Sequence, residues 1–169
     1  YEFFKQIQPY SRMPFLTVVG NHDLGKNQDL TLYREIFGPD YYAFSLQDNY
    51  FIVVNDTEPN GIGEAQWRWL EQELKQSLSY KTRLVFLHTP LCDPREGDKR
   101  HCLPEAAGRR LATLLRQFHV THVFAGHIHG YFAGSWDGVP YTITGGAGAP
   151  LYGTDPEHFF YHYLKVTLH

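Results

Sequence analysis

The sequence predicts an α/β protein in which mixed β-sheets are layered into a sandwich and flanked by helices. Short apolar runs alternate with helical patterns in the first two thirds of the chain, whereas the last third reads as antiparallel strands. Aromatic residues make up 16% of the chain, with 12 Tyr and 12 Phe, and such side chains fit the half-buried surface of a pleated sheet. This combination of alternating and antiparallel segments favours a layered domain with mixed sheets.

The elements expected in the first half follow from apolar spacing and turn residues. A helix over 64–78 is indicated by Trp67, Leu70 and Leu74, which recur at helical spacing. Before it we expect the end of a helix over 1–13, a strand over 15–19, a helix over 29–37 and an antiparallel pair of strands over 41–46 and 50–55.

The second half continues with further strands and one helix. Pro104 is suited to the first turn of a helix, and Asp137-Gly138 is suited to a hairpin turn. We expect a strand over 83–87, a loop over 89–103, a helix over 104–118, a strand over 121–125, a hairpin of 131–136 with 139–144, a Gly/Ala loop over 145–150 and a last strand over 158–168.

Size, charge and hydropathy limit the class of protein. The chain has 169 residues, so we expect a single domain over 1–169. The net charge is −3 and no basic stripe is present, so binding to duplex nucleic acid is not expected. No apolar run approaches the roughly 20 residues of a membrane-spanning helix, so we expect no membrane span.

Three of the expected strands are followed by side chains that bind metals. Sites in open α/β sheets gather beyond the carboxyl ends of strands. Imidazole nitrogens with amide and carboxylate oxygens suit Mn, Fe or Zn better than Mg or Ca alone. The side chains concerned are Asn21, His22 and Asp23 after the first strand, His88 after the middle one, and His127 and His129 after the third.

The spacing of these residues suggests how they could act. His127 and His129 are two apart, which places both rings on one side of an extended segment. His22 lies beside Asn21, where a protonated imidazole could reach a leaving group, and Asp23 could fix its tautomer. A single histidine at a strand end is usually a solvated or turn residue. Three such motifs in this order favour a metal-dependent hydrolase.

The same motifs resemble the calcineurin-like metallophosphoesterase family, and the resemblance covers nearly the whole chain. The matching segments are Gly20-Asn21-His22-Asp23, His88 ahead of Pro90, Gly126-His127-Ile128-His129 and the helical Gln66-Trp67-Arg68-Trp69-Leu70. The resemblance implies that Asn21, His88 and His127 bind one divalent metal ion and that His129 binds a second. It also implies that His22 and Asp23 assist protonation of the leaving group.

One part of the family pattern is absent from the sequence. No Asp-x-His and no Gly-Asp precedes Asn21, and Asp23 is the only Asp before residue 29. The chain therefore resembles an N-terminally truncated member, the carboxyl-terminal portion of a catalytic domain. We expect it to bind one metal ion or none, to catalyse poorly, and to expose a sheet edge through which a homodimer could form.

The function that the sequence predicts is hydrolysis of phosphate monoesters or diesters by a metal-activated hydroxide. Two alternatives stay open, a non-catalytic scaffold of the same fold and a mononuclear metal-binding module. His101 lies in the loop after His88 and could line a substrate cleft. In the same loop, a disulfide between Cys92 and Cys102 is slightly favoured and would indicate a periplasmic or secreted protein, whereas free thiols would fit the cytoplasm.

Overall fold

A computed structural model of the chain describes residues 6, 9, 12–95 and 101–168. Most of the helix expected over 1–13 lies outside these residues. The elements are η2 Asn21–Asp23, α2 Thr31–Phe37, β1 Tyr42–Leu46, β2 Asn49–Val53, α3 Glu64–Gln76, η3 Ser77–Ser79, β3 Thr82–Phe86, α4 Glu105–Gln117, β4 His122–Ala125, β5 Tyr131–Trp136 and β6 Val139–Thr144. Each lies within one or two residues of an expected helix, strand or turn.

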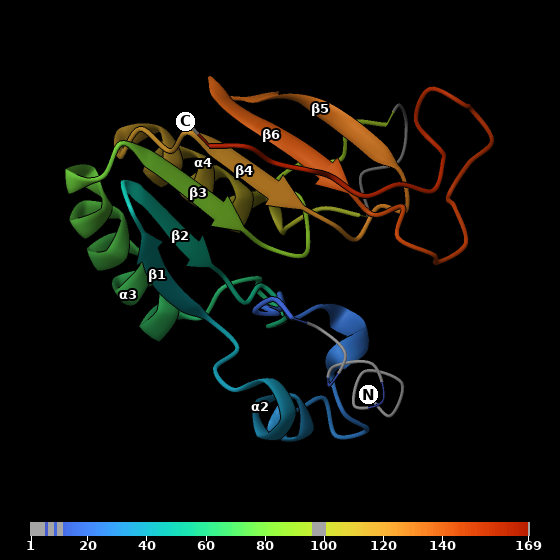
Figure 1. Cartoon of the computed structure of the whole chain (residues 1–169), viewed down its shortest axis with the longest axis horizontal. Helices are drawn as coiled ribbons and strands as arrows, with labels where there is room; N and C mark the ends of the chain where they lie inside the picture. Colours follow the sequence, from blue (N-terminus) through green and yellow to red (C-terminus); the bar gives the residue numbers. More distant parts are fainter. Residues whose placement is uncertain (1–5, 7–8, 10–11, 96–100, 169) are drawn as a thin grey trace.

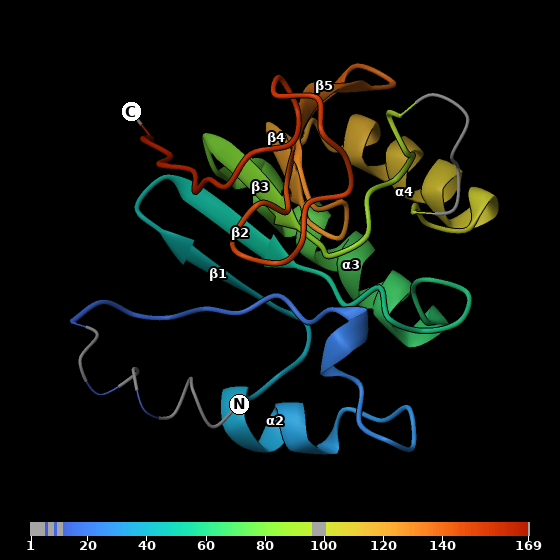
Figure 2. The same cartoon turned by 90° about the vertical axis from the view of Figure 1, so that its right-hand side faces the viewer.

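The strands form one mixed sheet of six in the order β1-β2-β3-β4-β6-β5 (Figure 1). β2, β3, β4 and β6 run parallel to one another, whereas β1 and β5 are antiparallel to their neighbours. The helices α3 and α4 connect parallel strands and lie on the same side of the sheet (Figures 1 and 2). The expected mixed α/β fold with flanking helices is therefore confirmed.

The side of the sheet that faces the helices holds the main core. Ile52, Val85 and Val123 occupy neighbouring positions on β2, β3 and β4, and all three are fully buried. They share one apolar cluster with Leu70 of α3 and Leu111 of α4. Alternate residues of each strand thus bury one face of the sheet against two amphipathic helices.

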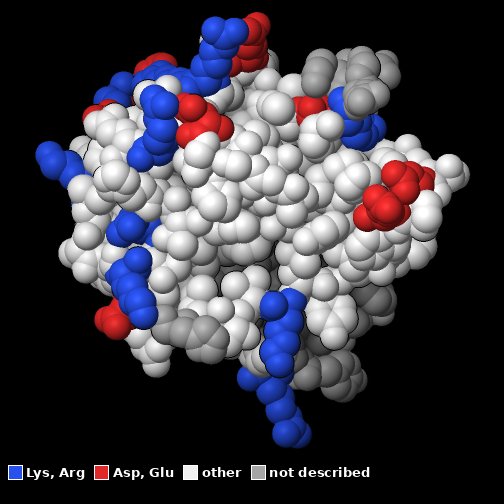
Figure 3. Space-filling model, turned by 90° about the horizontal axis from the view of Figure 1, so that it is seen from above, with Lys and Arg blue, Asp and Glu red and all other residues white. Residues whose placement is uncertain are grey.

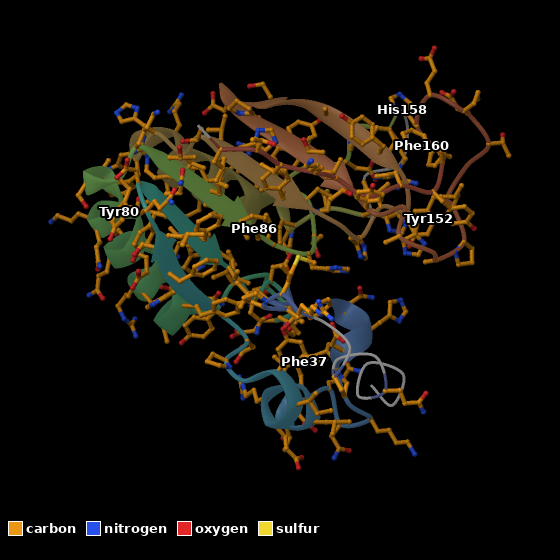
Figure 4. All side chains as sticks on the ribbon, in the orientation of Figure 1. Phe37, Tyr80, Phe86, Tyr152, His158 and Phe160 are labelled. Atoms are coloured by element: carbon orange, nitrogen blue, oxygen red, sulfur yellow. The ribbon has the colours of Figure 1, made fainter. Side chains whose placement is uncertain are left out.

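The opposite side of the sheet carries a row of stacked aromatic rings from four neighbouring strands, which we call the aromatic row. Phe44 stacks on Phe51 with centroids 4.6 Å apart, and Phe86 stacks on Phe124 at 5.1 Å. Phe51 and Phe86 join the two pairs at 6.4 Å. Phe86 lies near the middle of the molecule (Figure 4), and all four rings are only partly buried.

The structure corrects two strand predictions, and with them the expected sandwich. Residues 15–19 and 158–168 form no strand, so the described residues form a single sheet where two were expected. Thr17 contacts Tyr42 and Tyr33 through side-chain hydrogen bonds, not through a ladder. The final segment makes isolated bonds, such as Tyr131 N to His158 O at 2.7 Å. Both segments lie across the face of the aromatic row, where the sheet offers side chains and no free backbone edge.

Two further expectations concern the surface and the cysteines. In the described ranges, no helix is long and apolar enough to cross a membrane. When the molecule is seen from above, the Lys and Arg side chains on the visible face lie in separate groups, mostly near its margin (Figure 3). Cys92 and Cys102 are not joined to each other in the structure, so the slightly favoured disulfide is not formed.

Candidate metal centre

His88 and His127 are brought together by the parallel pairing of β3 and β4. β3 ends at Phe86 and β4 at Ala125, so each histidine follows its strand by two residues. The backbone N of Gly126 donates to the carbonyl oxygen of His88 at 2.9 Å, which extends the ladder past both strand ends. Neighbouring parallel strands thus deliver two imidazoles to the same edge of the sheet.

Asn21 reaches these imidazoles from a tight turn. The carboxylate of Asp23 accepts a hydrogen bond from the backbone N of Gly20 at 2.8 Å, and the N of Asp23 donates to the Gly20 carbonyl at 3.0 Å. This reciprocal pair closes η2 and presents Asn21 outward. Gly20 is required for close packing, because a Cβ there would lie 2.7 Å from Nδ1 of His88.

Side-chain atoms of Asn21 and His127 that could bind a metal both lie against Nε2 of His88. Nε2 of His88 lies 2.8 Å from Oδ1 of Asn21 and 3.0 Å from Nδ1 of His127. The two rings meet nearly edge to face, at 75°. An amide oxygen and two imidazole nitrogens that face one another are a suitable partial shell for a divalent transition-metal ion.

Both imidazoles are held in the neutral form that binds metals. Burial lowers the pKa of His88 to about 4, and the neighbouring rings of His127, His22 and His129 add to the shift. Burial likewise lowers the pKa of His127 to about 4, assisted by His101 and the other histidines. Near neutral pH each ring is therefore uncharged, which is the state in which an imidazole can bind a cation.

His127 adopts an unusual backbone conformation. Its φ is 63°, in the left-handed region, where a side chain other than glycine is uncommon. The next residue, Ile128, is fully buried in the main core. Anchoring of Ile128 therefore holds the neighbouring histidines at the opposite side of the segment, with backbone strain at His127.

His129 stands beside this trio with its own support. Its Nδ1 lies 2.7 Å from the carbonyl oxygen of Pro150, and its ring lies 4.2 Å from that of Tyr152. A carbonyl can only accept, so Nδ1 carries the proton and Nε2 keeps its lone pair. Such a hydrogen bond is the usual way to orient an imidazole for metal binding.

The structure adds two residues that sequence reasoning did not place in the site. His101 lies with its Nδ1 3.3 Å from Nε2 of His127, although the sequence suggested only that its loop could line a cleft. Tyr152, in the loop after β6 and labelled in Figure 4, has its ring 5.0 Å from that of His101 and 4.2 Å from that of His129. Loop conformation decides both positions, so no periodic signal in the sequence could have found them.

Asp56 supports His88 from inside the protein. Its Oδ2 accepts a hydrogen bond of 2.5 Å from the backbone N of Thr89, the residue after His88, and its Oδ1 is buried without a partner in the described part of the chain. Burial raises the pKa of Asp56 to about 7. The carboxyl group thus fixes the backbone that carries His88.

The predicted residues therefore separate into groups. Asn21 and His127 both contact His88, and His129 lies close enough to affect the pKa of both histidines. His22 is exposed and near enough to affect the pKa of both buried imidazoles. Among the residues that the structure describes, no group of three or more His, Cys, Asp or Glu side chains is placed to hold a metal ion. The trio of Asn21, His88 and His127 nevertheless suits a metal ion, because one of its three ligands is an asparagine amide oxygen and not a His, Cys, Asp or Glu side chain.

Parallel strands deliver two histidines to one sheet edge, where an asparagine on a tight turn meets them, and this arrangement suits a metal-dependent enzyme. The sequence pattern of the calcineurin-like phosphoesterases matches residues 1–131, and the chain belongs to that family.

Individual relatives are similar at low identity. The human serine/threonine-protein phosphatase CPPED1 is 26% identical over 170 residues, which cover 92% of this chain and 52% of that protein. The probable purple acid phosphatase 20 of Arabidopsis thaliana is 29% identical over 151 residues, 76% of this chain and 34% of that protein. This chain thus spans about half the length of the CPPED1 relative.

A solved structure shows the same fold. The purple acid phosphatase PPD1 from seeds of yellow lupin (Lupinus luteus) superposes with a TM-score of 0.70 at 19% identity. The match covers 92% of this chain and 35% of the lupin chain. At this identity the likeness supports the fold.

Proposed function

We propose that the protein hydrolyses phosphate esters in a metal-dependent reaction and that this chain supplies part of the metal centre. The convergence of Oδ1 of Asn21, Nε2 of His88 and Nδ1 of His127 carries the proposal. The phosphatase names of the relatives support the same class of reaction and favour phosphate monoesters as substrates.

The residues would divide the work as follows. Asn21, His88 and His127 would hold one Mn, Fe or Zn ion, and His129 would contribute to a second. When bound, such ions supply a hydroxide nucleophile and stabilise charge on the phosphoryl oxygens. His22 would donate a proton to the leaving oxygen, and Asp23 would hold the η2 turn that positions it.

The trio lacks a carboxylate, and this sets the expected strength of binding. Three neutral ligands offset none of the charge of a dication, and no Asp-x-His or Gly-Asp motif precedes Asn21 to supply a carboxylate. We therefore propose that this chain, as the carboxyl-terminal portion of a catalytic domain, binds one metal ion weakly or none and turns over slowly.

Metal content and hydrolysis together test this proposal. Zn²⁺ and Mn²⁺ would be titrated into the 169-residue chain by calorimetry, with hydrolysis of p-nitrophenyl phosphate and bis-p-nitrophenyl phosphate followed in parallel. We expect at most one ion per chain, bound by the wild type and by the control His119→Asn, and lost in His88→Ala. His119 is exposed at the end of α4, at the opposite end of β4 from His127.

The other outcomes decide between the alternatives. Two bound ions with rapid turnover would overturn the partial-centre proposal. Binding that persists in His88→Ala would remove the trio as the site. One tight ion without any turnover would favour the mononuclear metal-binding module, and neither metal nor turnover in a longer form of the protein would favour a scaffold.

We also propose two properties of its partners. β1 and β5 each pair on one side only in the described sheet, so a homodimer would form by pairing at one of these edges. Binding to duplex nucleic acid is not expected from a net charge of −3. Sedimentation at increasing concentration tests the first, and a duplex-binding assay at low salt tests the second.

A further inference from the structure

The amide oxygen of Asn21 fixes the direction of a chain of hydrogen bonds between ring nitrogens. Nε2 of His88 lies 2.8 Å from Oδ1 of Asn21, and an amide oxygen can only accept, so this nitrogen of His88 carries a proton and donates it. The same Nε2 lies 3.0 Å from Nδ1 of His127. Two N–H groups cannot point at each other over that distance, so Nδ1 of His127 has no proton and accepts.

The other nitrogen of His127 therefore carries the proton of that ring. Burial lowers the pKa of His127 to about 4, so near neutral pH the ring is uncharged and holds one N–H. With Nδ1 unprotonated, this proton is on Nε2, which lies 3.3 Å from Nδ1 of His101. His127 is thus the donor of this second bond and His101 the acceptor.

The loop that carries His101 is anchored beside the candidate metal centre. Leu103, two residues later, is buried in the main core, and its backbone N donates to the carbonyl oxygen of Pro90 at 2.9 Å. The ring of Tyr152 lies 5.0 Å from that of His101, with the planes at 55°. Packing and a backbone hydrogen bond therefore hold the acceptor nitrogen of His101 against His127.

The direction of the bond between His127 and His101 matters for metal binding. An imidazole binds a cation through its unprotonated nitrogen, and the metal centre proposed above needs Nδ1 of His127. A metal ion on Nε2 of His88 would replace the proton that His88 donates, so the bond to His101 would then be the one that fixes the tautomer of His127. Hydrogen bonds of this kind typically contribute about 10–100-fold to metal affinity.

We propose that His101 is a positioning residue of the candidate metal centre, whose Nδ1 accepts the Nε2 proton of His127 and so keeps Nδ1 of His127 open to a metal ion. The role of the metal ion rests on the proposed function. The hydrogen bond itself is a property of the protein without metal, so it can be measured with neither metal nor turnover.

The imidazole nitrogen resonances test this hydrogen bond directly. Long-range ¹H–¹⁵N correlation of a ¹⁵N-histidine sample, freed of metal by a chelator, separates protonated from unprotonated ring nitrogens, and His127→Gln identifies the signals of His127 by their loss. In the wild type we expect the proton of His127 on Nε2, at the downfield position of a hydrogen-bonded N–H. In His101→Leu this proton should move upfield and exchange faster with water, because its acceptor is gone.

Two asparagine variants separate the hydrogen bond from packing. In His101→Asn an amide oxygen stands near the place of Nδ1 and can accept, so the downfield position of the His127 proton should return. The control His119→Asn changes an exposed histidine at the end of α4 and should alter neither the signals nor zinc binding. Calorimetry should show zinc binding about tenfold weaker in His101→Leu and nearly as tight as wild type in His101→Asn.

Three results would contradict this role of His101. They are a proton on Nδ1 of His127 in the wild type, equal zinc affinity in the wild type and His101→Leu, and an equal loss of affinity in His101→Leu and His101→Asn. An absence of zinc binding in the wild type would count against the proposed metal ligands of this chain, whereas the nitrogen signals would still support or overturn the hydrogen bond.

Discussion

The body of the protein and its amino-terminal part differ greatly in how much apolar surface they bury. The described residues of the body, 41–95 and 101–168, include a cluster of 24 buried hydrophobic residues, whereas the amino-terminal part, residues 12–40, has a separate cluster of three, Val19, Leu30 and Tyr33. The candidate metal centre crosses between them, since Asn21 comes from the amino-terminal part and the histidines from the body. Two ligands of the trio therefore rest on a large core and the third on a small one.

The largest effect should come from a cavity in the body. Leu115 of α4 is fully buried, so Leu115→Ala should lower the free energy of unfolding by about 3 kcal/mol. Phe86→Ala, in the partly buried aromatic row, should lower the free energy of unfolding by about 1–2 kcal/mol, because the Phe86 side chain buries less apolar area on folding than Leu115 does. Urea unfolding measures both. Equal losses would show that the two sides of the sheet contribute alike.

The connection between the two regions should give the next largest effect. Asp40 accepts hydrogen bonds of 2.6 Å from Arg34 of α2 and from Asn55 after β2. Burial tends to raise the pKa of Asp40, but these two bonds outweigh it and lower the pKa. At neutral pH, Asp40→Asn should lose about 1.5–3 kcal/mol of stability.

The pH dependence tests the cause of that loss. Since the pKa of Asp40 is lower in the folded state, its contribution is present above the unfolded value and disappears as the pH falls through the folded value. The difference in urea midpoint between wild type and Asp40→Asn should therefore shrink between pH 7 and pH 3. A constant difference would point to lost packing in place of lost charge.

A change at the contact between the two regions should affect the site more than the fold. Gly20→Ala would place a Cβ 2.7 Å from Nδ1 of His88, whereas Gly126→Ala would place one 3.7 Å away, an ordinary contact. We expect Gly20→Ala to weaken zinc binding about tenfold, or about 1.4 kcal/mol, and Gly126→Ala to leave it nearly unchanged. Calorimetry measures both, and equal affinities would show that the ring of His88 can move aside.

The smallest effect should be confined to the amino-terminal part. The Tyr33 hydroxyl lies 2.6 Å from Oγ1 of Thr17, so Tyr33→Phe should cost about 1 kcal/mol. Hydrogen exchange should quicken for the amides of 17–36, while those of α3 and β3 keep their protection. Faster exchange throughout the chain would mean that the two regions unfold together.

The fold was largely predictable because most elements carry a local signal. The periodic apolar residues of α3 and α4 and the Asp137-Gly138 turn fixed type and place to within one or two residues. The failures, over 15–19 and 158–168, are apolar or aromatic segments that have the composition of strands. A strand also needs a backbone partner, and sequence composition contains no information on whether one is free.

The proximity of Asn21 and His127 to His88 was predictable, whereas the residues that support them were not. The sequence placed each of the three after an expected strand, and two of those strands, β3 and β4, are present. Contacts across loops supplied the rest, including His101 on His127 and Asp56 beneath Thr89. Such contacts depend on tertiary packing, so residue type and spacing alone did not identify them.

The left-handed conformation of His127 has a consequence for the evolution of stability. A non-glycine residue at φ 63° costs roughly 1 kcal/mol or more, which glycine at the same position would avoid. His127→Gly should therefore raise the melting temperature while removing an imidazole from the trio. Selection for thermal stability alone would favour that glycine, so a histidine at this position is a compromise between stability and the proposed metal binding.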